Sequence, residues 1–130
     1  MTSAAVDGVV LVVEDNSLNL MVAEGMLRLL GYTSYSVGDG LQALEALSEA
    51  AYRIILMDVH MPELDGYETT RRIRAELPAE RQPYIIALTA NAMANDPELC
   101  LAAGMNDYLA KPLTKEGLRR ALERATRSES

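Results

Sequence analysis

The sequence contains no tryptophan and no phenylalanine, and six tyrosines are its only large aromatic residues. A packed interior must therefore be built from aliphatic side chains, which leucine, isoleucine, valine, alanine and seven methionines supply. Apolar residues make up 49% of the 130, which is enough for the core of one domain. We expect a single domain over residues 8–125, a disordered N-terminal tail over 1–7 and a C-terminal tail over 126–130.

Positive charge is also scarce. Twelve lysines and arginines stand against nineteen aspartates and glutamates, which gives a net charge of −7. A negative surface repels the phosphate backbone of nucleic acids and the anionic surface of membranes. We therefore expect this chain to bind neither nucleic acid nor a membrane.

Cysteine is limited to Cys100, so no disulfide forms within the chain, which suits a reducing compartment. Residues 1–8 contain no basic residue, and the apolar run that follows them stops at Glu14. This pattern fits neither a signal peptide nor a membrane span. These absences together predict a cytoplasmic protein.

Short apolar segments, bounded by turn residues, alternate with amphipathic ones along the chain. The expected strands are Val9–Val13, Thr33–Val37, Ile54–Met57, Tyr84–Leu88 and Asp107–Leu109. The first, third and fourth are almost entirely apolar, as is typical of strands covered on both faces, so the second and fifth belong towards the edges. We predict an α/β fold: a doubly wound, flavodoxin-like, five-stranded parallel sheet in the order 2-1-3-4-5, with two helices on one face and three on the other.

Helical spacing of apolar residues and terminal capping residues mark the connecting segments. The expected helices are Leu18–Leu30, Leu41–Leu47, Tyr67–Leu77 and Leu113–Arg124. A further helix is expected in the fourth unit, with Asp96 as its N-cap, Pro97 as its first residue and Gly104 as its stop. Asn16 or Ser17 is the predicted cap of the first helix, and Gly31 its stop. Residues 90–95 are expected to be a mobile loop or a frayed first turn.

Polar residues follow four of the five strands within one or two positions. Glu14 and Asp15 follow the first, Asp58 the third, Thr89 the fourth and Lys111 the fifth. Any one acidic residue in such a turn is ordinarily structural. The carboxyl ends of parallel strands meet at one edge of the sheet, where ligands bind, so these five side chains together indicate a functional site.

Three carboxylates that converge repel one another by several kcal/mol at an effective dielectric constant of about 20. Lys111 supplies one compensating positive charge, and a hard divalent cation such as Mg²⁺ would supply two more. Such a site favours attack by a carboxylate on phosphorus to give an acyl phosphate, because the metal and the ammonium neutralise the transferring oxygens.

Four segments make the resemblance to a known family specific. They are Val12-Val-Glu-Asp-Asn-Ser, Met57-Asp-Val-His-Met-Pro-Glu-Leu-Asp-Gly, Ala87-Leu-Thr-Ala and Asp107-Tyr-Leu-Ala-Lys-Pro. In order and spacing they resemble the signature segments of the response-regulator receiver domains of two-component signalling. The similarity covers about residues 8–125, and two of its segments are most like receivers of hybrid sensor histidine kinases.

The resemblance implies a role for each residue at the sheet edge. Asp58 is the implied phosphoacceptor, and Asp15 and Asp58 are implied carboxylate ligands of Mg²⁺. Glu14 acts through a metal-bound water, and the backbone carbonyl of His60 completes the protein ligands. No other cofactor is implied.

The remaining implied roles concern the phosphoryl group and the response to it. Lys111 contacts the phosphoryl group, Thr89 closes on it, and Tyr108 moves inward in step. The Lys111-Pro112 bond is commonly cis in the family. The implied partner is a histidine kinase or a histidine-phosphotransfer protein, and the domain catalyses only its own phosphorylation and dephosphorylation. The oligomeric state stays open.

Three residues allow more than one interpretation. His60 stands where related domains often carry Gln or Met, and it is a loop residue, a metal ligand or a phosphocarrier. Arg53 replaces a common Asp at the start of the third strand, which we interpret as a surface change. Tyr108 is either a switch residue or an amphipathic side chain on an edge strand.

Two other classes of protein share part of this pattern. Haloacid-dehalogenase-type phosphotransferases also use an Asp nucleophile, Mg²⁺ and a Lys, but they need a second Asp where this chain has His60. They also need room for a substrate cap. Flavodoxin-like cofactor binders share the expected sheet, but the loop after the first strand is acidic here, which disfavours a flavin phosphate.

Overall fold

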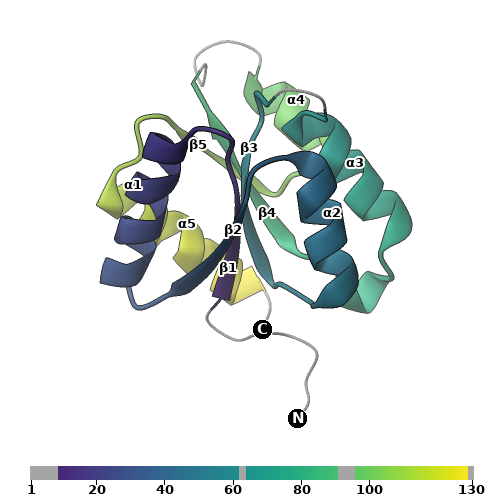
Figure 1. The fold of residues 1–130 in the computed structure, drawn as a ribbon, viewed down its shortest axis with the longest axis horizontal. Helices are drawn as coiled ribbons and strands as arrows, with labels where there is room; N and C mark the ends of the chain where they lie inside the picture. Colours follow the sequence, from purple (N-terminus) through teal and green to yellow (C-terminus); the bar gives the residue numbers. More distant parts are fainter. Residues whose placement is uncertain (1–8, 62–63, 91–95, 129–130) are drawn as a thin grey trace.

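Five parallel strands form one sheet in the order β2-β1-β3-β4-β5 in the computed structural model, which describes residues 9–61, 64–90 and 96–128 (Figure 1). The strands are β1 (Val9–Val13), β2 (Thr33–Val37), β3 (Ile54–Asp58), β4 (Tyr84–Thr89) and β5 (Asp107–Ala110). All four strand pairs are parallel. The predicted fold class, strand order and edge strands are therefore confirmed.

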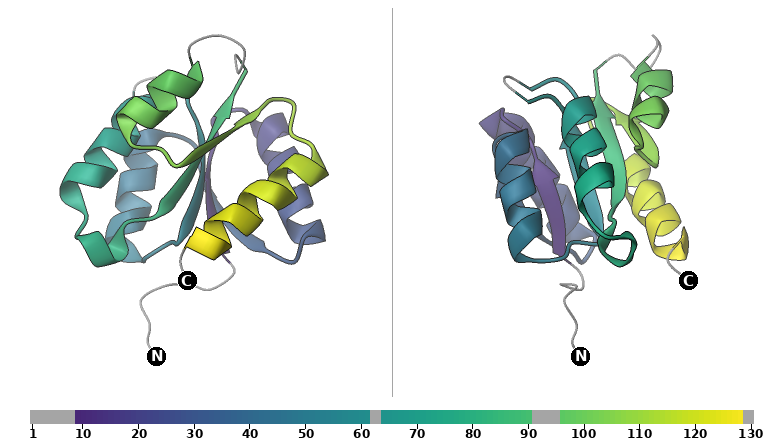
Figure 2. Two further views of the ribbon diagram at one scale, coloured as in Figure 1. Left: turned by 180° about the vertical axis from the view of Figure 1, so that it is seen from behind. Right: turned by 90° about the vertical axis from the view of Figure 1, so that its right-hand side faces the viewer.

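In the described part of the chain, four α-helices and one short 3₁₀ helix connect the strands, and a fifth α-helix follows β5. They are α1 (Ser17–Leu29), α2 (Gly40–Glu49), α3 (Gly66–Glu76), η1 (Ala79–Arg81), α4 (Asp96–Ala103) and α5 (Lys115–Ser128). Helices α1 and α5 cover one face of the sheet, and α2, α3 and α4 cover the other (Figures 1 and 2). No helix in the described part of the chain is long and apolar enough to cross a membrane.

The core is divided by the sheet into two layers because successive side chains of a strand point to opposite faces. Val10 and Val12 pack with α1 and α5, whereas Leu11 and Val13 pack with the helices of the opposite face. Strand β3 is buried at every position. Cys100, the single cysteine, is buried in the layer beneath α4.

Local signals set the ends of the helices. Of the two predicted caps of α1, Asn16 or Ser17, the structure shows Asn16, whose side-chain oxygen accepts a hydrogen bond from the Asn19 N–H at 3.0 Å. Asp65 caps α3 in the same way, through the Glu68 N–H at 2.9 Å. Gly31 follows α1 with a φ of +93°, a conformation that favours glycine, so its predicted role as the stop is confirmed.

Several boundaries differ from the predicted ones. Asp58, Thr89 and Ala110 belong to their strands rather than to the turns after them. Helix α5 begins at Lys115 and continues to Ser128, into the predicted C-terminal tail. The predicted mobile loop at 90–95, apart from Ala90, and the predicted N-terminal tail lie outside the described residues.

The apolar stripe that identified α1 in the sequence lies mostly on the outside of the molecule. Leu18, Met21 and Leu29 are 68%, 66% and 71% exposed. The residues of α1 that the sheet buries are Ala23 and Leu27. The helix itself is confirmed, but Leu18, Met21 and Leu29 face solvent.

Candidate functional site

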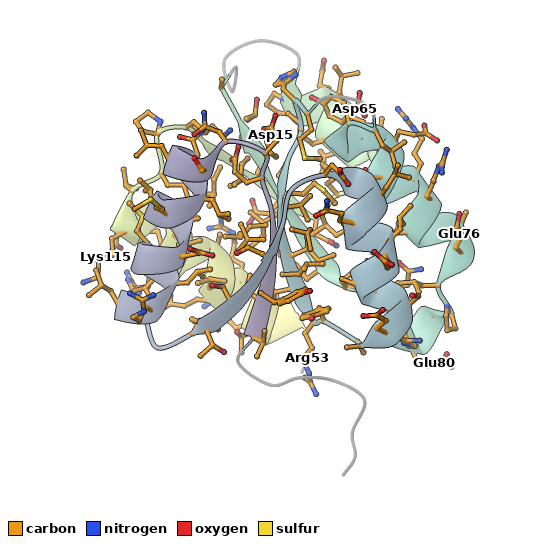
Figure 3. The ribbon with its side chains drawn as sticks, viewed as in Figure 1. Asp15, Arg53, Asp65, Glu76, Glu80 and Lys115 are labelled. Carbon is orange, nitrogen blue, oxygen red and sulfur yellow. The ribbon has the colours of Figure 1, made fainter. Side chains whose placement is uncertain are left out.

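The register of the sheet brings the predicted site residues to one edge. Val13 lies opposite Met57, so the residues that follow β1 and β3 emerge side by side. Asp58 in turn lies opposite Leu88, one residue before Thr89 at the end of β4. Figure 3 shows Asp15 at this edge, beyond the end of β1.

Three carboxylates converge there. Glu14, Asp15 and Asp58 each offer an oxygen, and these oxygens all lie within 4.8 Å of one another. Glu14 and Asp58 are each only 3% exposed, whereas Asp15 is open to solvent. Two of the three carboxylates are thus buried, and the third is accessible from solvent. Hard oxygen donors of this kind suit Mg²⁺.

Lys111 joins the two buried carboxylates. Its ammonium nitrogen lies 3.2 Å from Oε1 of Glu14 and 3.3 Å from Oδ1 of Asp58. The Lys111 N–H also donates a hydrogen bond to the Thr89 carbonyl at 2.8 Å, which fixes the start of the Lys111 side chain beside β4. The Lys111 ammonium therefore lies beside the position of a negatively charged oxygen in a group bound to Asp58.

Burial raises the pKa of Glu14, and the negative charge of Asp58 raises it further. The Asn16 N–H, which donates to Oε2 of Glu14 at 3.2 Å, and the charge of Lys111 lower the pKa but do not outweigh the first two causes. The negative charge of the carboxylates at the site is therefore not fully balanced by the positive charge of Lys111. A bound cation would remove this imbalance.

The loop after β3 holds the Asp58 carboxylate from one side. The His60 N–H donates a hydrogen bond to Oδ1 of Asp58 at 3.1 Å, while the exposed His60 ring lies edge-on to Tyr67, with centroids 6.4 Å apart. The sequence did not indicate how closely Gly66 approaches this loop. A Cβ on Gly66 would lie 2.7 Å from the Val59 Cα, and closer still to the Asp58 carbonyl oxygen. In a sequence, an Asp-Gly pair such as Asp65-Gly66 is typical of a turn and gives no sign of this contact.

The two predicted switch residues lie on the neighbouring strands. Thr89 is fully buried at the end of β4. Tyr108, on edge strand β5, is 39% exposed and lies opposite Ala87. The Lys111-Pro112 peptide bond is cis, as the resemblance implied.

Comparison with known proteins identifies the family. The response regulator receiver domain family matches residues 10–123, nearly all of the chain. This chain belongs to the response regulator receiver domain family. Membership of this family disfavours the dehalogenase and flavodoxin alternatives.

The relatives include receivers carried by large kinases. The chain is 40% identical over 119 residues to the sensor histidine kinase RcsC of Salmonella typhi, and 42% identical over 112 residues to the sensor protein GacS of Pseudomonas syringae pv. syringae. These matches cover 89% and 84% of the chain but only 12% of each relative. The chain therefore corresponds to one domain of such proteins.

A solved receiver structure is also similar. It is the receiver domain of the sensor histidine kinase PA1611 from Pseudomonas aeruginosa PAO1, which has a magnesium ion coordinated in its active-site cleft. The two chains are 51% identical, with a TM-score of 0.82, over 92% of this chain and 97% of that one.

Proposed function

We propose that this receiver domain accepts a phosphoryl group on Asp58 from the phosphohistidine of a histidine kinase or a histidine-phosphotransfer protein. The observation that carries the proposal is the pair of buried carboxylates, Glu14 and Asp58, joined by the Lys111 ammonium at 3.2 and 3.3 Å. A buried carboxylate beside a fixed cation is suited to nucleophilic attack on an anionic phosphoryl group. The domain then catalyses only its own phosphorylation and dephosphorylation.

The residues present fit Mg²⁺ because all three side chains of the acidic cluster are carboxylates. Asp15 and Asp58 would be direct ligands, Glu14 would act through a bound water, and the His60 carbonyl would complete the set. Mg²⁺, when bound, supplies charge neutralisation to the transferring phosphoryl oxygens.

The reaction forms one bond and breaks one. A carboxylate oxygen of Asp58 attacks phosphorus, the oxygen–phosphorus bond of the acyl phosphate forms, and the nitrogen–phosphorus bond to the donor imidazole breaks. Lys111 then contacts the transferred group. The buried Thr89 hydroxyl, at the end of the adjacent strand, turns towards it.

The phosphoacceptor is tested with acetyl phosphate as the donor. We expect the intact mass of the wild type to rise by one phosphoryl group in the presence of Mg²⁺, and Asp58→Asn to show no such rise. Asp65→Asn is the matched control, because Asp65 caps α3 and should still allow labelling of Asp58. Equal labelling of the wild type and Asp58→Asn would contradict the assignment.

The exposed apolar face of α1 supports a docking site for the phosphodonor. A small cavity of about 80 Å³ is lined by both Val22 of α1 and the site residues Glu14 and Lys111, so this face borders the site. Exposed apolar surface beside a reactive group favours a protein partner. Asp58 is the last residue of β3. Helix α1 covers one face of the sheet to which β3 belongs (Figure 1).

A pair of variants separates docking from chemistry. Met21→Glu places a charge on the exposed face of α1, and we expect at least tenfold slower transfer from a radiolabelled histidine-phosphotransfer protein. Labelling by acetyl phosphate should not change, because that donor needs no protein surface. Leu101→Glu is the control, since Leu101 is 61% exposed on α4. Equal transfer rates for Met21→Glu and the control would refute docking on α1.

The response to phosphorylation involves Thr89 and Tyr108. When Thr89 turns towards the phosphoryl group it vacates space, and the exposed Tyr108 ring then turns inward. This movement changes the surface formed by α4, β5 and α5, where Leu99 and Leu101 are exposed. That surface is the proposed docking site for a downstream partner.

A further inference from the structure

A second concave site lies at the opposite end of the sheet. This cleft, with a volume of about 850 Å³, lies where β3 and β4 begin, beside η1 and the end of α3. Three arginines line it, Arg53, Arg74 and Arg81, and among the residues that the structure describes Glu80 is the only acidic one that does so. Figure 3 shows Arg53 and Glu80 at the end of the molecule away from Asp15.

Arg74 is the most constrained of the three arginines. It donates hydrogen bonds to the carbonyls of Gly104 and Pro83, each at 2.8 Å, and to the side-chain oxygens of Gln82 and Asn106, each at 2.7 Å. All four acceptors are neutral, and among the described residues no carboxylate forms an ion pair with Arg74. Burial lowers the pKa of Arg74, as it does for a cation without a counter-ion.

Arg81 adds an unused donor to the wall of the same cleft. One terminal N–H group donates to the Leu47 carbonyl at 2.8 Å. The Nε–H of Arg81 is buried and has no hydrogen-bond partner in the part of the chain that the structure describes. A buried donor of this kind is normally satisfied, and an oxyanion that reached it would also balance the charge of the guanidinium.

The cleft also has surface for the rest of a ligand. Tyr52, Leu77 and Tyr84 line it together with the arginines. The Tyr52 ring is held by stacking on Tyr35, with centroids 6.2 Å apart and an interplanar angle of 11°. The volume of the cleft lies within the range of small-molecule sites, about 300–1,000 Å³.

We propose that this cleft binds a small molecule through an oxyanion, either a phosphate or a carboxylate group, held by the guanidinium group of Arg81 with the positive charge of Arg74 beside it. Four of the five N–H donors of Arg74 already donate to neutral acceptors, so Arg74 contributes mainly its charge. Guanidinium groups bind such oxyanions through paired, charge-assisted hydrogen bonds. Arg53 supplies a further positive charge at the rim. The site does not depend on the proposed phosphorylation, since Arg53 precedes β3 and Asp58 ends it.

The test is an NMR titration of the arginine side-chain Nε–H signals with inorganic phosphate, with succinate and with sodium chloride, at equal ionic strength. We expect phosphate or succinate to shift the Arg74 and Arg81 signals saturably with one dissociation constant, and chloride to leave them unchanged. The anion that saturates identifies which head group the site takes. Equal shifts with all three salts, or saturable shifts confined to residues around Lys111, would overturn the proposal.

Matched variants complete the test. Arg81→Gln should weaken binding of the saturating anion at least tenfold, whereas Arg71→Gln should change it less than twofold. Arg71 is an exposed arginine of α3 that pairs with Glu68 at 2.9 Å and does not line the cleft, so both variants lose the same charge. If Arg81→Gln does not fold, Arg53→Gln replaces it with an expected loss of at least threefold. Unchanged affinity in the variant that folds refutes the site.

Discussion

Replacing Glu14 with glutamine should make the metal-free protein more stable, although it alters a buried residue of the site. The glutamine has nearly the same shape, but its single side-chain oxygen can replace only one of the two oxygens of Glu14. The Asn16 N–H donates to Oε2 and the Lys111 ammonium lies against Oε1. The substitution therefore removes the negative charge together with one of these two hydrogen bonds. Its effect on the free energy of unfolding therefore measures the electrostatic imbalance of the site.

The magnitude follows from the distances. Two unit charges 4.8 Å apart repel by about 3.5 kcal/mol at an effective dielectric constant of about 20, and Glu14 has two such neighbours, Asp15 and Asp58. Lys111, at 3.2 Å, attracts Glu14 by about 5 kcal/mol on the same scale. Because Asp15 is exposed, its share is reduced by solvent, but the burial of Glu14 adds a cost of the same sign. The hydrogen bond that the amide cannot replace costs about 1 kcal/mol, so we expect Glu14→Gln to be about 1 kcal/mol more stable than the wild type.

The assay is urea unfolding with EDTA and with saturating Mg²⁺. In EDTA the variant should have the higher midpoint, and Mg²⁺ should stabilise the wild type by more than it stabilises the variant. Mg²⁺ at a hundred times its dissociation constant would add about 2.7 kcal/mol to a protein that binds it only when folded. Glu45→Gln is the control, because Glu45 is exposed on α2, and its stability should stay within about 0.5 kcal/mol of the wild type.

The pH dependence of this difference has a defined sign. The pKa of Glu14 is raised in the folded protein, so the folded state binds this proton more tightly than the unfolded chain does. The wild type then loses stability as pH rises through the two pKa values of Glu14. The advantage of Glu14→Gln should be complete above the raised pKa and should vanish below the ordinary pKa of glutamate. A variant that is less stable than the wild type in EDTA at neutral pH would refute the reasoning.

Three further predictions follow from the same geometry. Lys111→Met should lower the free energy of unfolding of the metal-free protein by about 3 kcal/mol, because it leaves two buried carboxylates without their cation. Unchanged stability in a urea titration would contradict this. Gly66→Ala should lower the free energy of unfolding by about 1–3 kcal/mol, because the added Cβ meets the backbone after Asp58. Its control is Gly25→Ala, which should not destabilise the protein, because there is open space around Gly25. A beryllofluoride mimic with Mg²⁺ should shift the backbone NMR signals from Thr89 as far as Tyr108, and shifts confined to the neighbours of Asp58 would disprove the switch.

The sequence predicted both the sheet and the residues of the candidate site, and for the same reason. Almost entirely apolar segments identify buried parallel strands, and the residues after them must then meet at one edge. Glu14, Asp58 and Lys111 were found in this way without any knowledge of distance. That Lys111 joins both carboxylates depends on the register of the strands and the path of the chain after β5, which hydrophobic patterning does not encode.

Other features had no sequence signal because they arise where distant segments meet. Arg74 and Arg81 come from the end of α3 and from η1, and Asn106 precedes β5, so no motif spacing relates them to a common cleft. The close approach of Gly66 to the backbone after Asp58 is likewise a tertiary contact. The Asp-Gly pair indicated a turn, but only the packing of α3 against β3 explains why a side chain has no space there.

Helix α1 shows why apolar spacing alone does not identify the core. The sheet buries Ala23 and Leu27 on one side of α1, and the small side chain of Ala23 suits close packing of the helix against the sheet. Leu18 and Met21 lie on the opposite side and are mostly exposed. Exposed large apolar side chains on a helix do not stabilise the isolated domain, because the water around them is not released. They become favourable when a partner covers them, and Val22 lines a small cavity together with Glu14 and Lys111, so a partner on this face would sit beside Asp58.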